Sequence, residues 1–178
     1  MQVVGEGVAG AAFRRLGLWP AQPFSTEAAS ALLDHPMEQT LGLLEILVST
    51  HLLQSPTPGA YRFHELLGEF AAERAGQEEC PDVRQAGLLR IIAWYRAATR
   101  QADLATRTRA HIDPAPDPGA PLPEFTDTDQ APAWITAEMP AIQNAVRTAA
   151  AIRPELAWPT ADTLFGWTLA NWWAIQYR

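Results

Sequence analysis

Apolar residues in the first 50 positions recur at helical spacing and predict three helices, over residues 8–19, 25–33 and 36–50. Ser25 is a good N-cap for the second helix, because its hydroxyl can accept a hydrogen bond from a backbone N–H two or three residues further on. Two short stretches of strand-like sequence then flank the turn residues Pro56–Gly59 and predict a β-hairpin. Three helices followed by a hairpin is the order of a winged helix.

Two helices are predicted directly after the hairpin. The first covers residues 64–74 and is expected to stop at Gly76, because glycine readily takes the conformation that ends a helix. The second covers residues 82–109. Phe70 in the first helix and Leu104 in the second fall at apolar positions and are expected to be buried.

The remaining sequence predicts more helix after one interruption. Residues 113–123 are rich in Pro and Gly and predict an exposed, mobile loop. A helix capped by Asp129 follows, and a last helix begins near Thr160. The fold class is therefore mainly α, with a winged-helix domain over residues 1–79 and a helical bundle over residues 80–178.

The charge pattern argues against several functions. The net charge is −7, and every basic residue apart from histidine is arginine. A phosphate-binding loop of the form G-x-x-x-x-G-K-[ST] and Schiff-base catalysis both need a lysine, which the sequence lacks. The helix predicted over residues 36–50 would read DNA in a DNA-binding winged helix, yet it carries Glu38 and Glu45 and no arginine. We therefore expect no direct DNA binding by this helix.

Catalytic and metal-binding patterns are also missing from the sequence. The four histidines do not have metal-ligand spacing, and no G-x-S-x-G motif occurs. Cys80 is the sole cysteine, so it can form no internal disulfide and contributes to no metal-ligand cluster. We expect no metal site and no enzymatic activity. No run of 18 apolar residues and no secretory signal are present, so a cytoplasmic location without membrane contact is expected.

Three features each allow two interpretations. His64 begins a predicted helix, where free N–H groups suit an anion such as phosphate, or where its ring could simply bond a nearby carbonyl. The arginines of the helix over 82–109 form either a solvated face or a basic flank for an acidic partner. Trp172 and Trp173 near the C-terminus either pack on the preceding helix or form an interface.

Three segments carry a resemblance to a known family. The stretch over residues 61–75, which begins Tyr61-Arg62-Phe63-His64-Glu65-Leu66-Leu67, resembles the "RYRFHDLLREYARERA" stretch of bacterial signal-transduction NTPases of the NB-ARC (STAND) class, which include the SARP-type transcriptional regulators. Phe13-Arg14-Arg15-Leu16-Gly17-Leu18-Trp19-Pro20 is similar to the winged-helix domain of the same proteins. The stretch over residues 133–142, which begins Ala133-Trp134-Ile135, resembles the helix that precedes their tetratricopeptide-like repeats, and it implies that the helical bundle over residues 80–178 is the start of such repeats.

The resemblance implies a non-catalytic regulatory and scaffold module that acts in transcriptional signalling through protein–protein contacts. His64, flanked by Phe63 and Glu65, would contact the β-phosphate of ADP, although Glu65 stands where the family usually has Asp. The chain itself would need no cofactor, whereas the intact family protein binds ADP or ATP with magnesium. Its expected partners are an upstream nucleotide-binding domain and further helical repeats. The alternative is a stand-alone winged-helix DNA-binding regulator.

Overall fold

The computed structural model describes residues 2–20, 23–106, 117–127 and 129–162. The chain forms two compact units. The first comprises Met1–Ile91 with Gly119–Pro121, and the second comprises Ile92–Pro118 with Leu122–Arg178. The domain boundary expected between residues 79 and 80 stays a prediction.

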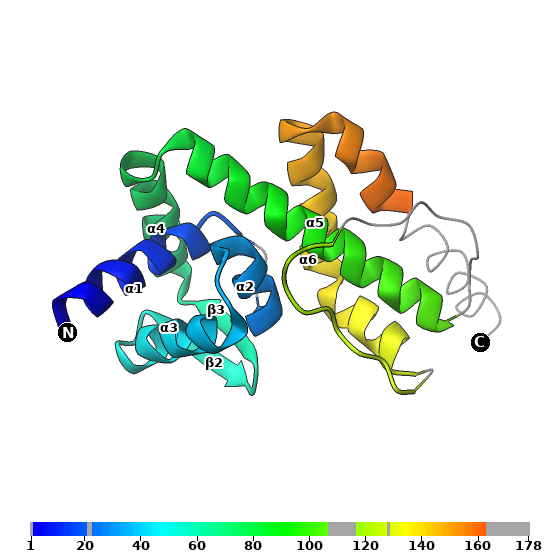
Figure 1. Cartoon of the computed structure of the whole chain (residues 1–178), viewed down its shortest axis with the longest axis horizontal. Helices are drawn as coiled ribbons and strands as arrows, with labels where there is room; N and C mark the ends of the chain where they lie inside the picture. Colours follow the sequence, from blue (N-terminus) through cyan, green and yellow to red (C-terminus); the bar gives the residue numbers. More distant parts are fainter. Residues whose placement is uncertain (1, 21–22, 107–116, 128, 163–178) are drawn as a thin grey trace. The chain divides into compact units, whose positions relative to one another are not determined.

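The first unit contains helices and one small antiparallel sheet (Figure 1). Its elements are α1 (Gln2–Leu16), β1 (Phe24–Ser25), α2 (Thr26–Leu33), α3 (Met37–Ser49), β2 (Leu53–Thr57), β3 (Ala60–Phe63), α4 (Glu65–Glu78) and the start of α5 (Pro81–Thr106). The second unit contains the rest of α5, then α6 (Gln130–Ile152) and a helix over 154–162. The structure confirms the predicted fold class, a mainly α chain with a winged helix and a helical region.

The predicted hairpin is the larger part of a three-stranded sheet ordered β1-β3-β2. Leu53 of β2 lies opposite Phe63 of β3, and Gly59 in the turn has φ 77°, a conformation that glycine adopts without strain. The sequence pattern missed β1, because its two residues are too few to show strand alternation. Phe24 of β1 pairs with Tyr61, and Ser25 caps α2 as predicted, accepting a hydrogen bond from the Ala28 N–H at 3.1 Å.

An aromatic cluster joins the sheet to α1. The ring of Phe63 meets Phe13 edge-on, with centroids 5.5 Å apart, and lies 6.3 Å from the ring of Phe24. Tyr61 and Phe63 are both buried, whereas Arg62 between them is exposed. Side chains alternate between the two faces of a strand, so Arg62 and His64, two residues apart, both point away from the core.

Several predicted boundaries and buried positions were wrong. Helix α4 continues through Gly76 to Glu78, and its last turn is held by ion pairs to α1. Phe70 is 51% exposed although its ring centroid lies 6.3 Å from that of Phe13, whereas Ala71, next to it in α4, is buried against Gly17 in the turn after α1. Leu104 is 52% exposed, since the buried side of α5 at that level is formed by Ala102 and its neighbour, Asp103.

The Pro-rich loop is not exposed along its whole described length. Ala120 is buried because Gly119–Pro121 pack with the first unit. Residues 113–116 lie outside the described residues, as do Trp172 and Trp173.

In the second unit, α6 begins where predicted, with Asp129 at the N-cap, but the Asp129 side chain makes no capping hydrogen bond. Ile135 of α6 packs with Ala102 of α5 in a buried cluster. The Tyr95 hydroxyl donates a hydrogen bond to Glu138 Oε2 at 3.0 Å. The next helix begins at residue 154, earlier than the predicted start near Thr160.

Arg90 of α5 does not lie on a purely solvated face. Its Nε donates to the Ala31 carbonyl and its Nη2 to the Leu32 carbonyl, both at 3.1 Å. Nη1 lies 3.7 Å from Oδ2 of Asp34, which closes α2 in a left-handed conformation with φ 61°. Arg90 therefore satisfies carbonyls that the end of α2 leaves without helical partners.

Replacing Arg90 with Met should destabilise the first unit by about 1 kcal/mol, because two carbonyls lose a charged donor while most of the aliphatic stem is kept. Urea unfolding gives the difference in free energy. Arg96→Met on the same helix is the matched control, and we expect a change within about 0.5 kcal/mol. Equal effects of the two substitutions would show that Arg90 does not cap α2.

Candidate functional site

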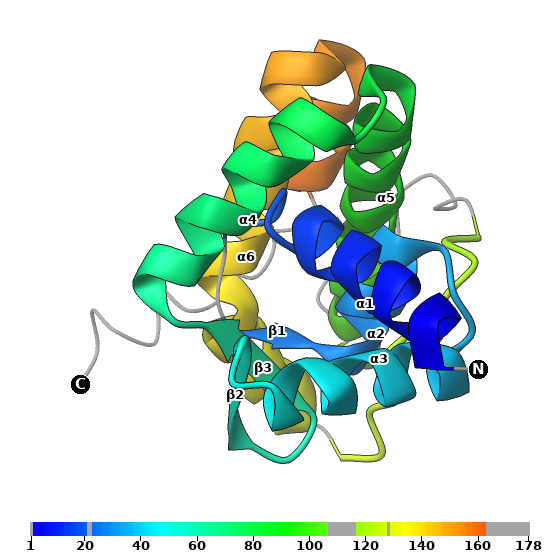
Figure 2. The same cartoon turned by 90° about the vertical axis from the view of Figure 1, so that its left-hand side faces the viewer.

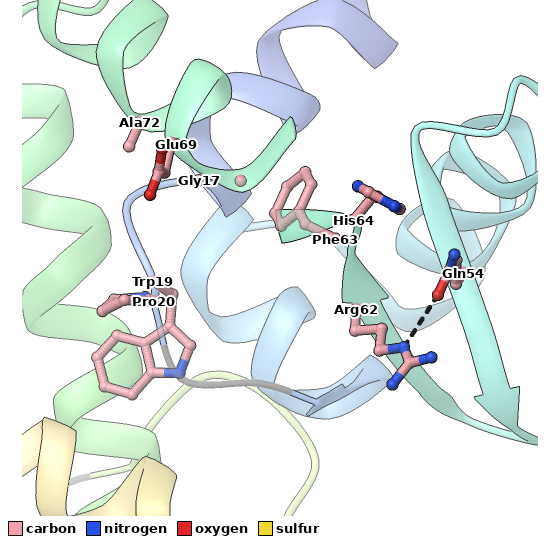
Figure 3. A pocket seen from close by; sticks show the side chains of 10 residues that line it. Gly17, Trp19, Pro20, Gln54, Arg62, Phe63, His64, Glu69 and Ala72 are labelled. Atoms are coloured by element: carbon pink, nitrogen blue, oxygen red, sulfur yellow. Dashed lines mark hydrogen bonds between the residues drawn. The ribbon is translucent and has the colours of Figure 1, made fainter. Parts of the chain in front are cut away.

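A pocket of about 660 Å³ opens beside the start of α4 in the first unit (Figure 3). Three segments form its walls: the turn after α1, the β2–β3 hairpin and the first two turns of α4. The lining residues are Gly17, Trp19, Pro20, Gln54, Arg62, Phe63, His64, Gly68, Glu69 and Ala72. The pocket thus brings the turn after α1 together with the hairpin and the start of α4, which follow one another in the sequence more than 30 residues later.

His64 is the N-cap residue of α4 and has extended backbone angles, φ −67° and ψ 140°. Its carbonyl accepts hydrogen bonds from the N–H groups of Leu67, at 2.8 Å, and Gly68, at 3.1 Å. The His64 side chain is exposed and makes no capping hydrogen bond. Local capping therefore does not account for this histidine, and its ring can meet a ligand in the pocket.

Arg62 adds a second basic side chain to the same pocket. Its Nε donates to Gln54 Oε1 at 3.0 Å across the hairpin, as the dashed line in Figure 3 marks. This bond orders the side chain and uses only one of the five N–H donors of the guanidinium. The other four N–H donors belong to the two terminal nitrogens of the guanidinium. These nitrogens are the groups that recognise carboxylates and phosphates.

The electrostatic character of the pocket favours an anion at one end. Arg62, His64 and the N-terminus of α4 all contribute positive charge or N–H donors there. Glu69, one turn along α4, adds a negative charge to the lining of the same pocket (Figure 3). The described residues contain no group of His, Cys, Asp and Glu placed to hold a metal ion. The arrangement is suited to binding a small anionic group.

Phe63 and Glu65, the two predicted neighbours of His64, occupy different places in the fold. Phe63 is buried in the aromatic cluster and fixes the backbone that carries His64. Glu65 is the first residue of α4. Sequence reasoning missed Gln54 and Trp19 as pocket residues, because both come from segments that meet His64 only in the folded chain.

Two curated proteins are similar to the chain. Regulatory protein AfsR of Streptomyces coelicolor is 36% identical over 147 residues, which is 78% of this chain and 14% of that protein. Regulatory protein AfsR of Streptomyces griseus is 34% identical over 146 residues, 79% of this chain and 15% of that protein. The chain is a distant homologue of part of AfsR. It spans about one-seventh of the length of these two relatives.

No protein-family model matches the chain, and no solved structure matches it significantly. In the described part of the chain, no helix has both the length and the apolar character needed to span a membrane. The relation to AfsR therefore rests on sequence similarity alone.

Proposed function

We propose that the chain is a non-catalytic regulatory module of a SARP-type transcriptional regulator of the NB-ARC (STAND) class, and that His64 contacts a phosphate of bound ADP. Homology to part of AfsR, a protein named as regulatory, supports the general role. The resemblance of residues 61–67 to the family motif supports the specific one. In this proposal, the module regulates by making the contact between His64 and the ADP phosphate or by losing it.

The observation that carries the proposal is the position of His64. The ring is exposed, it lines the pocket, and it stands beside Arg62 and the N-terminus of α4. These groups are suited to one phosphate, and the sequence contains no lysine of the kind that phosphate-binding loops use. We therefore propose that a nucleotide-binding domain supplies the remaining contacts, with the phosphate-binding lysine and magnesium that such sites use.

The alternative, a winged helix that reads DNA by itself, has less support. The exposed face of α3 carries Glu38 and Glu45, and the helix contains no arginine. DNA affinity comes largely from basic side chains that neutralise phosphates. A gel shift with random duplex DNA distinguishes the two functions, because DNA binding that weakens steeply as salt rises would favour the alternative.

The chain alone should bind ADP weakly, with a Kd of about 1 mM or higher, because only one phosphate is engaged. In an NMR titration, ADP should shift the ring signals of His64, and the shift should not depend on magnesium. His64→Asn should weaken binding by at least about 3-fold, the loss of roughly one hydrogen bond. No ATPase activity is expected.

His51→Asn is the matched control, since His51 is exposed and lies at the α3–β2 turn, outside the pocket. Its backbone has φ 59°, which asparagine tolerates well. Tight, magnesium-dependent ATP binding by this chain, or an equal loss of ADP binding in both variants, would contradict the proposed role of His64.

A further inference from the structure

The outer face of α3 combines apolar and acidic side chains in a pattern that the fold of this chain does not explain. Leu41 is 41% exposed and Ile46 is 44% exposed, on either side of a row formed by Glu38, Gly42 and Glu45. Thr40, Leu43, Leu44 and Leu47 already fill the buried side of the helix. Figures 1 and 2 both place α3 at the periphery of the first unit.

Gly42 occupies the centre of this face. A glycine in a helix interior lowers helix stability relative to alanine, so an unexplained one needs a reason. A Cβ atom built at Gly42 meets nothing within 4 Å, so no packing among the residues that the structure describes requires its small size. At a helix surface, a missing side chain allows another helix to approach closely.

The spacing of these residues forms two adjacent holes of the kind that receive a side chain from a facing helix. Such a hole is bounded by residues i, i+3, i+4 and i+7. The first hole is bounded by Glu38, Leu41, Gly42 and Glu45, and the second by Gly42, Glu45, Ile46 and Ser49. Each hole is bounded by one large apolar side chain, Leu41 or Ile46, and by at least one carboxylate. Gly42 borders both holes and, having no side chain, leaves room in each.

The charges of the face determine the chemistry of its partner. Within the described residues, neither Glu38 nor Glu45 takes part in an ion pair. A purely apolar helix would bury both carboxylates without a partner, which is costly. DNA, an anionic membrane surface or the same face of a second copy would bring negative charge against negative charge.

We propose that this α3 face docks an amphipathic helix of a partner protein whose contact side carries both large apolar and arginine or lysine side chains. Apolar side chains enter the two holes over Gly42. The basic side chains lay their aliphatic stems along Leu41 and Ile46 and place their charges on Glu38 and Glu45. None of the residues of this face lines the His64 pocket, so a partner helix bound to α3 would leave that pocket unoccupied.

The test uses the 178-residue chain and a fluorescent peptide of about 20 residues, long enough to form a helix, with leucine at heptad positions a and d and arginine at e and g. Fluorescence anisotropy gives the affinity, and NMR shifts of backbone amides locate the site. We expect the largest shifts in α3. A second peptide, with serine in place of every leucine, measures attraction by charge alone and should bind at least about 10-fold more weakly.

Two variants of α3 test the two parts of the proposal. Gly42→Leu fills the holes, and Glu45→Lys reverses the charge; each should weaken peptide binding by at least about 10-fold. Both variants should fold, because each change faces solvent, and far-UV circular dichroism checks this. The control is Glu73→Lys on α4, an exposed glutamate on the same helix as the exposed Leu66 and Phe70, and it should change binding by less than about 2-fold.

The proposal is overturned if Gly42→Leu leaves the affinity unchanged, or if Glu73→Lys weakens binding as much as Glu45→Lys. Equal binding of the serine and leucine peptides would also overturn it, since charge alone would then explain the contact. None of these results bears on His64, whose ADP titration tests the proposed function separately.

Discussion

Gly17→Ala should destabilise the first unit by about 3 kcal/mol, at the upper end of the cost of overpacking a core. A Cβ atom at Gly17 would lie 2.6 Å from the carbonyl carbon and the Cβ of Ala71 and from the backbone nitrogen of Ala72. These atoms belong to the body of α4 and not to a flexible side chain. The turn after α1 and helix α4 must therefore move apart.

The separation should also disturb the aromatic cluster and the pocket. Phe13 of α1 contacts the rings of Phe63 and Phe70, and Gly17 itself lines the pocket beside His64. Gly17→Ala should consequently reduce the ADP-induced shift of His64 as well as the free energy of unfolding. Urea unfolding, together with hydrogen exchange of the α4 amides, measures the loss of stability where it occurs.

Gly42→Ala is the matched control, because it makes the same change within a helix whose outer surface is open. It should stabilise the chain by about 0.5–1 kcal/mol through the higher helix propensity of alanine. If the two substitutions had effects of the same sign, the close approach of Gly17 to α4 would not be a feature of the folded protein.

The parts of the fold that could be predicted from the sequence are those with a strong local signal. Ser25 before an apolar run predicted the start of α2, and the turn residues Pro58 and Gly59 predicted the hairpin. The end of α4 was missed because Gly76 is a local stop signal, whereas the contacts that hold the last turn come from α1, more than 60 residues away. Tertiary contacts overrode local propensity there.

The residues of the candidate site also divide into those with a local sequence signal and those without one. His64 was predicted at the start of a helix, and the structure places it at the N-cap of α4. The opposite wall, formed by Gly17 and Trp19, has no sequence signal that links it to His64. Arg62 stands in the sequence only as one residue of the stretch that resembles the family motif, and its bond to Gln54 depends on the register of the hairpin. Its role as a second basic group in the pocket therefore emerged only from the fold.

Glu79→Gln should destabilise the first unit by about 2–3 kcal/mol at pH 7, a little below the cost of breaking a fully buried ion pair. The Glu79 side chain is 7% exposed and is held from both sides. Arg14 Nε donates to Oε1 at 2.9 Å, and Arg15 Nε donates to Oε2 at 3.1 Å. Both arginines are themselves partly exposed, so after the change water compensates a share of the loss.

Glu78→Gln provides the neighbouring control. Glu78 also pairs with Arg14, at 3.2 Å from Nη1, and with Arg74, but its side chain is 34% exposed. Exposed ion pairs contribute little, so we expect a loss of less than about 1 kcal/mol. A loss as large as that of Glu79→Gln would indicate that total charge at the end of α4, and not the buried carboxylate, determines stability.

The contribution of Glu79 should also depend on pH in a defined direction. Burial alone would raise the pKa of the Glu79 carboxyl, but the hydrogen bonds and charges of Arg15 and Arg14 outweigh burial and lower this pKa below its usual value of 4.5. Because the folded pKa is then below the unfolded one, the stabilisation is complete above about pH 4.5 and is lost as the pH falls through the folded pKa. The difference in unfolding free energy between the wild-type chain and Glu79→Gln should therefore be constant from pH 7 to pH 5 and shrink below pH 4.5. A difference that stayed constant throughout acid titration would show that the charge of Glu79 does not join α1 to the end of α4.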